Sequence, residues 1–117
     1  MNELDLFAYK ILTREQWEQW RAEALFTGAP VDLADGYIHL SARDQVAETL
    51  TKHFAGQDEL MLAMVDLPAL GDLVKWEVSR GGALFPHVYG SIPFDAVTTK
   101  AKLRLSADGK HALPAGF

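Results

Sequence analysis

Cysteine is absent from this 117-residue sequence. Its absence excludes disulfide bonds, thiolate chemistry and zinc sites with sulfur ligands. The first ten residues, MNELDLFAYK, carry acidic side chains where a signal peptide carries positive charge. We therefore expect a cytoplasmic protein.

Long apolar runs and a surplus of basic residues are also missing. Lys, Asp or Glu interrupts each hydrophobic stretch, so we expect no membrane association. Eleven Lys and Arg stand against 16 Asp and Glu, a formal net charge of −5, which argues against a duplex nucleic-acid partner. The longest basic cluster, Lys100, Lys102 and Arg104, alternates along a predicted strand and is interpreted as its solvated face.

Several common functional motifs do not occur. Without Gly-x-Gly-x-x-Gly or a P-loop, the commonest dinucleotide and nucleoside-triphosphate folds are excluded. Without Gly-x-Ser-x-Gly, Ser41 is better explained as a helix cap than as a nucleophile. His39, Glu77 and His87 could supply two histidines and a carboxylate to a metal, but no local ligand spacing supports such a site, so no metal is expected.

What is present is the composition of a globular protein, with 49% hydrophobic and 23% charged residues. The length suits one domain over residues 1–117. We expect residues 107–117 to form a loose C-terminal tail, because Pro114 and Gly116 lie in it.

Two helices are predicted in the first half of the chain. Thr13 and Gln16 have the spacing of a capping box, which predicts a helix over residues 13–24 with Trp17, Trp20 and Ala24 on its buried side. Ser41 is a suitable cap for a second helix over residues 42–54. The segment between them, residues 26–35, has Gly, Pro and two Asp and is interpreted as a loop.

Strand patterns dominate the rest of the chain. They predict an α+β fold, in which the helices pack against a split, bent and mostly antiparallel sheet. Pro86 cannot donate to a ladder, so its segment, residues 83–89, is expected to be an edge strand or an extended loop. The other predicted strands are residues 6–12, 37–40, 60–65, 74–79 and 98–105.

The segment GYIHLS, residues 36–41, is the first candidate for function. Strand alternation places Tyr37, His39 and Ser41 on the face opposite the core, just before a helix whose free N–H groups attract phosphate or carboxylate. Gln45 adds an amide one turn along. A purely structural interpretation remains open, in which Ser41 only caps, Tyr37 only packs and His39 is a hydrogen-bonded histidine at the sheet margin.

The segment FPHVYG, residues 85–90, repeats this composition. In extended form it presents Phe85, His87 and Tyr89 on one face, and an imidazole serves as acid or base near neutral pH. The structural alternative is a segment that packs its aromatic rings inward. We predict one site with His39, His87 and Glu77 as catalytic residues and Tyr37, Ser41, Gln45 and Tyr89 as substrate-binding residues.

These motifs, together with Tyr9-Lys10-Ile11 and Trp76-Glu77, resemble a family of small bacterial domains of unknown function. Some of its members have been labelled glutathione S-transferase-like, although the N-terminus here has no thioredoxin-like βαβ pattern. The family is grouped by fold with the ADP-ribosyltransferases and the RNA 2′-phosphotransferases. The second motif strand of the phosphotransferases, Ile-His-Phe-Ala, is similar to residues 38–41.

The resemblance implies an ADP-ribosyltransferase-like fold and a pocket for a small molecule or nucleotide, with NAD as the leading cofactor candidate and a transferase as one possible activity. The chain differs from the superfamily at two points. Tyr9-Lys10 stands where a first-strand histidine is common, and the late-strand glutamate has no clear equivalent. The alternative function is a non-catalytic interaction module or homodimer that exposes Trp76, Phe85 and Tyr89. The sequence leaves the oligomeric state open.

Overall fold

The computed structural model describes residues 6–79 and 82–114. In that part of the chain the elements follow in this order: β1 (Phe7–Leu12), α1 (Arg14–Glu23), β2 (Leu25–Phe26), α2 (Pro30–Asp35), β3 (Ile38–His39), the 3₁₀ turn η2 (Arg43–Gln45), α3 (Val46–His53), β4 (Leu60–Asp66), η3 (Pro68–Leu73), β5 (Val74–Val78), β6 (Leu84–Val88), β7 (Ile92–Pro93), η5 (Phe94–Ala96), β8 (Val97–Leu105) and β9 (His111–Ala112).

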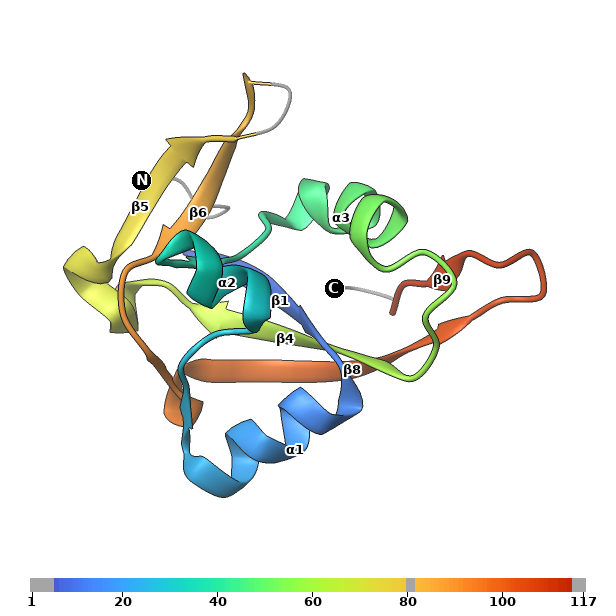
Figure 1. Ribbon diagram of the computed structural model, residues 1–117, viewed down its shortest axis with the longest axis horizontal. Coiled ribbons are helices and arrows are strands. Elements are labelled where there is room, and N and C mark those ends of the chain that lie inside the picture. The colour runs from blue at the N-terminus through green and yellow to red at the C-terminus, as the bar shows by residue number, and fades with distance from the viewer. Residues whose placement is uncertain (1–5, 80–81, 115–117) are drawn as a thin grey trace.

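The strands form a larger sheet in the order β1-β4-β8-β9, a smaller one in the order β3-β6-β5, and the short pair β2-β7. All of these pairings are antiparallel. A bridge between Tyr9 and Ser41 joins the larger sheet to the chain just after β3, so the sheets form one curled surface (Figure 1). The predicted α+β class and antiparallel sheet are therefore confirmed.

The larger sheet is covered on both faces. Its strand β4 is almost entirely apolar, and its successive side chains point to opposite faces. Met61 and Ala63 of β4 face α1 and share a core cluster with Trp17 and Trp20. Leu62, on the other face, belongs to a second cluster that α3 closes with Val46 and Leu50. Figure 1 shows α1 and α3 on opposite sides of β4. In the described part of the chain, no helix is long and apolar enough to cross a membrane.

The start of α1 follows from its predicted capping box. The Gln16 backbone N–H donates to Thr13 Oγ1 at 3.1 Å, and the Thr13 N–H donates to Gln16 Oε1 at 2.9 Å, as predicted. Ala24 is exposed and takes a left-handed conformation at the C-cap, so its predicted place on the buried side is wrong. The left-handed conformation of Ala24 turns the chain away from the helix axis, so the helix ends there.

The interpretation of residues 26–35 as a loop is wrong, because they contain α2. Pro30 occupies the first helical turn, where its missing N–H costs nothing. Asp32 Oδ2 accepts the Ala29 N–H at 2.8 Å and holds the N-terminus, while Gly36, with φ of 87°, ends the helix. The same Pro, Asp and Gly residues that mark turns also mark the ends of a short helix.

The prediction of an edge position for the Pro86 segment is also wrong, because β6 lies between β3 and β5. The Pro86 carbonyl accepts the Leu40 N–H at 3.0 Å, and the nitrogen and carbonyl of one strand residue point to the same side. Pro86 therefore directs its nitrogen away from β5, toward the side where β3 has already ended at His39. A proline is tolerated in this central strand because its neighbour is only two residues long.

Part of the tail also differs from expectation. His111 and Ala112 form β9, pairing with Leu105 and Arg104 of β8. His111 Nε2 lies 2.7 Å from the Gln57 carbonyl oxygen, which ties the hairpin to the loop after α3. Strand pairing and a side-chain contact therefore fix a segment in which the sequence suggested only loose chain. Residues 115–117 lie outside the described part.

Candidate functional site

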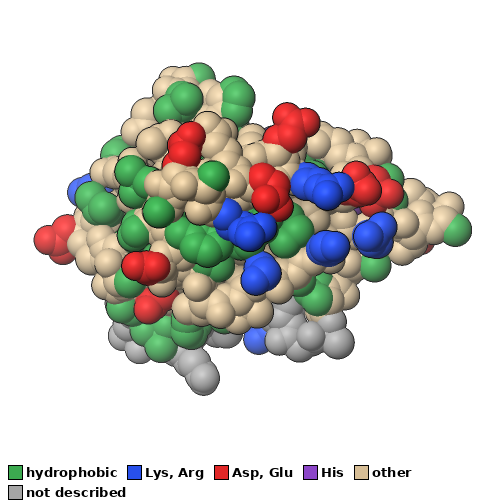
Figure 2. Space-filling model, turned by 90° about the horizontal axis from the view of Figure 1, so that it is seen from below, with side chains coloured by type: hydrophobic (Ala, Val, Ile, Leu, Met, Phe, Trp, Pro, Cys, Tyr) green, Lys and Arg blue, Asp and Glu red, His purple; other side chains and the backbone are tan. Residues whose placement is uncertain are grey.

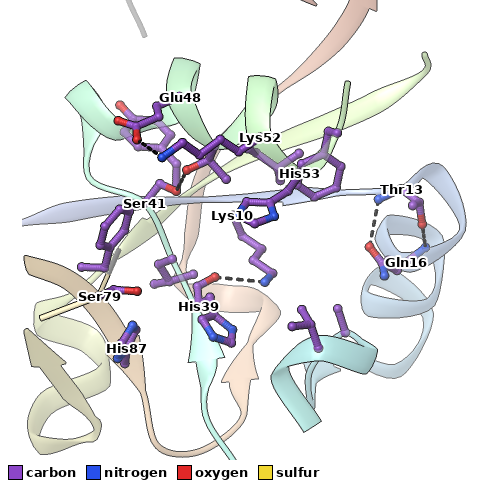
Figure 3. A pocket seen from close by; sticks show the side chains of 18 of the residues that line it. Lys10, Thr13, Gln16, His39, Ser41, Glu48, Lys52, His53, Ser79 and His87 are labelled. Carbon is purple, nitrogen blue, oxygen red and sulfur yellow. Dashed lines mark hydrogen bonds and ion pairs between the residues drawn. The ribbon is translucent and has the colours of Figure 1, made fainter. Parts of the chain in front are cut away.

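A groove of about 390 Å³ opens where the two sheets meet (Figure 3). One wall is α3, where Lys52 pairs with Glu48 and His53 borders the groove, and another is formed by the strand segments that carry His39 and His87. Apolar side chains line much of the remaining surface, among them Tyr9, Ile11, Leu40, Phe54 and Phe85. Such a mixture of apolar walls and a few polar groups is typical of a small-molecule site.

The two histidine motifs meet at this groove. His39 and His87 are register partners in the β3–β6 ladder, and their ring centroids are 5.5 Å apart. The ring of Tyr37 stacks on His87 at 4.2 Å and lies 5.2 Å from the ring of Tyr89. The prediction that the two segments face one another is confirmed, and cross-strand pairing is the reason.

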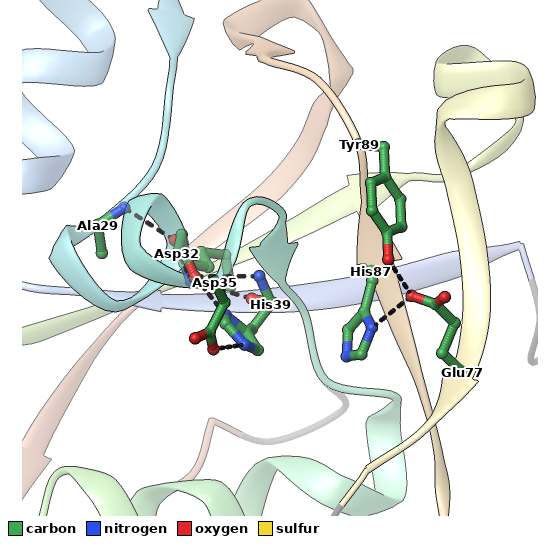
Figure 4. Close-up of polar contacts among 8 residues, drawn as sticks. Ala29, Asp32, Asp35, His39, Glu77, His87 and Tyr89 are labelled. Carbon is green, nitrogen blue, oxygen red and sulfur yellow. Dashed lines mark hydrogen bonds and ion pairs between the residues drawn. The ribbon is translucent and has the colours of Figure 1, made fainter.

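Asp32 of α2 holds one half of the site together. Its carboxylate accepts a hydrogen bond from Lys10 Nζ at 2.9 Å. It also accepts one from the His39 backbone N–H at 3.1 Å and lies 2.7 Å from His39 Nδ1 (Figure 4 shows the His39 contacts). The Asp32 side chain is 1% exposed. Lys10 Nζ also donates to the His39 carbonyl oxygen at 3.0 Å. This cluster fixes α2, β1 and β3 to one another.

Both ring nitrogens of His39 contact carboxylates. Nδ1 contacts Asp32, and Nε2 lies 2.9 Å from Oδ2 of Asp35. Ionised carboxylates only accept hydrogen bonds, so both contacts are hydrogen bonds when both ring nitrogens carry a proton. This geometry fits a positively charged imidazole and leaves no lone pair for a metal or for a proton from a substrate.

Asp32 stays ionised despite its burial. Burial alone raises the pKa of this carboxyl, but the hydrogen bond from His39, the charge of Lys10 and the two backbone N–H groups lower it to about 2. Burial lowers the pKa of Lys10, and the adjacent Asp32 charge opposes that shift. The pair is therefore a buried ion pair whose two members depend on each other.

His87 differs from His39 in its partners. Its Nδ1 lies 2.8 Å from Glu77 Oε1, and the same oxygen accepts the Tyr89 hydroxyl at 2.6 Å (Figure 4). Because the Glu77 carboxylate is an acceptor, Nδ1 carries the proton, and Nε2 of the neutral ring holds a lone pair. His87 is 3% exposed, and its Nε2 is buried without a hydrogen-bond partner in the described part of the chain.

The hydrogen bonds around Glu77 favour its ionised form. The bond from the Tyr89 hydroxyl and then that from His87 lower the pKa of the Glu77 carboxyl. The same contact with Glu77 raises the pKa of Tyr89 to about 12. Glu77 does not itself line the groove and is 39% exposed, so it positions the His87 ring.

Residues 11–100 match the family described as protein of unknown function DUF952. The chain belongs to the DUF952 family. An X-ray structure of protein CC0527 from Caulobacter crescentus is 50% identical, over 92% of this chain and 94% of that chain, with a TM-score of 0.87. A solution NMR structure of CC0527 is also 50% identical, over 90% of each chain, with a TM-score of 0.80. No match is found among curated proteins.

Two predicted binding residues of this DUF952 protein have other contacts. Ser41 does not cap a helix, since η2 and then α3 begin after it. Its hydroxyl lies 2.9 Å from Thr49 Oγ1, which itself donates to the Gln45 carbonyl oxygen, so Ser41 is the donor of that pair. The Gln45 side chain accepts the Ala42 N–H and donates to the Leu84 carbonyl oxygen, and it does not line the groove.

The predicted aromatic interaction surface is wrong. Trp76 is the register partner of Pro86, so alternation places it on the face opposite Phe85. Trp76 packs against the core cluster and Phe85 lines the groove. Tyr89 shares the face of His87 and donates to Glu77. The three rings therefore do not form one exposed surface.

Sequence reasoning missed Lys10 and Asp32 of the DUF952 chain. Lys10 lies in the apolar segment FAYKIL, on the same strand face as the buried Ala8 and Leu12. A lysine at such an inward position signals a buried carboxylate partner. That signal was available from strand alternation, but the identity of its partner, 22 residues away, was not.

Within residues 6–79 and 82–114, no group of three or more His, Asp or Glu side chains could hold a metal ion.

Proposed function

We propose that the groove binds a small molecule and that His87 Nε2 is the polar group that contacts it. The observation that carries this proposal is the buried Nε2, which lacks a hydrogen-bond partner in the described residues although its ring borders the groove. A buried polar atom without a partner costs about 1–3 kcal/mol. A ligand that supplies the missing hydrogen bond recovers that free energy.

The arrangement of Glu77, His87 and Tyr89 supports a role for His87 as acid or base. Glu77 fixes the ring orientation and holds the proton on Nδ1, which leaves Nε2 free to accept a proton. Tyr89 holds Glu77 in turn at 2.6 Å. In this proposal His87 is the catalytic residue of a transferase, and Glu77 and Tyr89 are positioning residues.

NAD and ADP-ribose are the first ligands to test, because the family resemblance implies an ADP-ribosyltransferase-like pocket. The residues that line the groove support this choice. Its apolar walls suit a flat ring system. Lys52 at the α3 wall is half exposed and pairs with Glu48 at 2.7 Å, and in this proposal it exchanges that carboxylate for a phosphate of the ligand. His39 would then contribute by holding β3 in place and by its positive charge, with Asp32 and Asp35 retaining both of its protons.

A thermal-shift series with NAD and ADP-ribose tests the proposal. At about ten times its Kd, a ligand of the folded state adds about 1.4 kcal/mol of stability, which raises the Tm of a domain of this size by several degrees. We expect that increase in the wild type and in His111→Phe, where a histidine outside the groove is replaced. We expect none in His87→Phe. An increase of the same size in His87→Phe would contradict the proposal.

A second measurement reads the proposed atom directly. In a ¹⁵N spectrum of the imidazole rings, ligand binding should shift the Nε2 resonance of His87 and leave both nitrogens of His111 unchanged. A ligand that raises the Tm without changing Nε2 binds elsewhere.

A further inference from the structure

A second hollow, of about 330 Å³, lies on the opposite side of the larger sheet between α1 and β8. Figure 2, which views the molecule from below, shows Lys and Arg side chains gathered on this face. Trp17, Leu60 and Met61 are buried at its base. The charged residues that line it are Arg14, Glu18, Arg21, Glu59, Lys100, Lys102 and Arg104.

The fold assembles this hollow from segments that are far apart in the sequence. Lys102 pairs with Met61 and Lys100 with Ala63, so both lysines project from the face that α1 covers. The partners on β4 are buried whereas the lysines are exposed, because α1 packs against β1 and β4. Arg14 and Arg21 are two turns apart on α1, about 10 Å along its axis.

The charge of the hollow is opposite to that of the protein. Five cations and two carboxylates line it, a surplus of three positive charges in a chain of net charge −5. Arg21 contacts Glu18 at 3.2 Å. The other four cations form no ion pair within 4 Å with any residue that the structure describes. Because the cations outnumber the carboxylates beside them, they repel one another, and a bound anion relieves that repulsion.

We propose that this hollow binds an oligophosphate, either a free phosphate chain or the phosphate chain of a nucleotide. Lys100, Lys102 and Arg104 recur every second residue along β8, about 7 Å apart, so they form a row of positive charges about 14 Å long that suits a chain of several phosphates. Glu18 and Glu59 stand at the hollow as well, so a ligand that runs past the cations meets carboxylates.

Two larger polyanions fit the hollow less well. Single-stranded nucleic acids are bound through exposed aromatic rings on which bases stack, whereas the ring at this base, Trp17, is 4% exposed. An anionic membrane is bound by basic residues together with apolar side chains that insert, and the apolar residues that line this hollow are buried. A compact phosphate chain needs neither feature.

Isothermal titration calorimetry with tripolyphosphate and with ATP tests the inference. We expect both to bind, more tightly at low salt (about 50 mM) than at high salt (about 300 mM), because the contacts are exposed and screened. Lys102→Glu should weaken both affinities by at least about tenfold. The matched control is Lys110→Glu, which makes the same charge change in the β8–β9 turn and should leave the affinities within about twofold.

Arg14→Gln provides a second variant from the other wall of the hollow and should weaken binding as well. The Tm of each variant is measured first, and binding is measured at a temperature well below it, so that a folding defect is not mistaken for lost binding. Absence of binding by the wild type at low salt would overturn the inference, as would equal losses in the Lys102 and Lys110 variants. Tighter binding to a single-stranded oligonucleotide or to anionic vesicles than to tripolyphosphate would overturn it too. Because His87 is remote from this hollow, His87→Phe should bind both phosphates like the wild type, which separates this inference from the groove proposal.

Discussion

His39 and His87 are register partners on neighbouring strands, and yet the molecule surrounds them differently. His39 has a carboxylate on each ring nitrogen, one of them the fully buried Asp32. His87 has a carboxylate on Nδ1 alone, and its Nε2 has no partner in the described residues. The first arrangement uses the whole hydrogen-bonding capacity of an imidazole within the protein, whereas the second leaves the hydrogen-bonding capacity of one nitrogen unused.

The contrast shows that residue type and exposure together do not reveal which histidine keeps an unpaired ring nitrogen. The His39 side chain is 29% exposed and that of His87 is 3% exposed, so exposure alone would favour His39. The two histidines differ in the partner of Nε2, which is Asp35 for His39 and is lacking for His87 in the described residues. Four substitutions or titrations can break or sharpen this contrast.

The largest effect is expected for Asp32→Ala. This substitution leaves Lys10 buried without its counter-charge and removes the acceptor that holds His39, so the free energy of unfolding should fall by about 3–5 kcal/mol. Urea denaturation monitored by circular dichroism measures it. Asp35→Ala, at the exposed partner of His39, is the control and should cost less than about 1 kcal/mol. Equal losses at the two positions would remove the distinction between a buried and an exposed partner.

The same substitution at the two histidines should have different consequences. His39→Phe removes a hydrogen bond to a buried charge and should destabilise the protein by about 1.5–3 kcal/mol. His87→Phe removes a buried unpaired nitrogen and leaves Glu77 accessible to water, so it should change stability by less than about 1 kcal/mol. Paired denaturation curves decide the comparison, and a larger loss at His87 would contradict it.

Acid titration should lower the stability contributed by Asp32. Its folded pKa is about 2, below the ordinary value of 3.8, so its contribution is complete above pH 3.8 and is lost as the pH falls toward 2. The shift corresponds to about 2 kcal/mol. The difference in unfolding free energy between wild type and Asp32→Asn should shrink over this interval. A difference that stays constant between pH 5 and pH 2, roughly the range in which such carboxylates titrate, would show that Asp32 is not shifted.

The smallest effect concerns Tyr89, whose pKa is raised to about 12 by Glu77. In an ultraviolet titration of tyrosinate, Tyr89 should ionise at about pH 12, and Glu77→Gln should bring its pKa back toward 10. Tyr89→Phe identifies the transition by removing it. If Glu77→Gln leaves the transition in place, the Tyr89–Glu77 contact does not determine the pKa.

Local patterns in the sequence predicted much of the fold. The capping box at Thr13 and the strand over residues 60–65 depend only on near neighbours, and both predictions were confirmed. The patterns failed where a distant segment decides the outcome. Pro86 lies in a central strand because β3 ends beside it, and Ser41 is paired with Tyr9 of another sheet instead of capping a helix.

The candidate site shows the same division. The faces of the two histidine segments followed from strand alternation, which brought His39 and His87 together. Their different hydrogen-bond partners could not be predicted, because those of His39 include Asp32 in a segment interpreted as a loop. The basic hollow was hidden for a similar reason, since Arg14 and Lys102 become neighbours only when α1 packs across the sheet.

The bridge between Tyr9 and Ser41 has a consequence for motion. Two backbone hydrogen bonds of 2.8 Å make this bridge, and the groove extends across it from β1 to β6. Any widening of the groove would have to open this bridge, together with the Lys10 contacts that also fix β1 to Asp32 and β3. The amide protons of Tyr9 and Ser41 should then exchange with solvent faster than those at the centre of β4. A ligand that touches both sheets should slow their exchange, so these two amides report on opening of the groove.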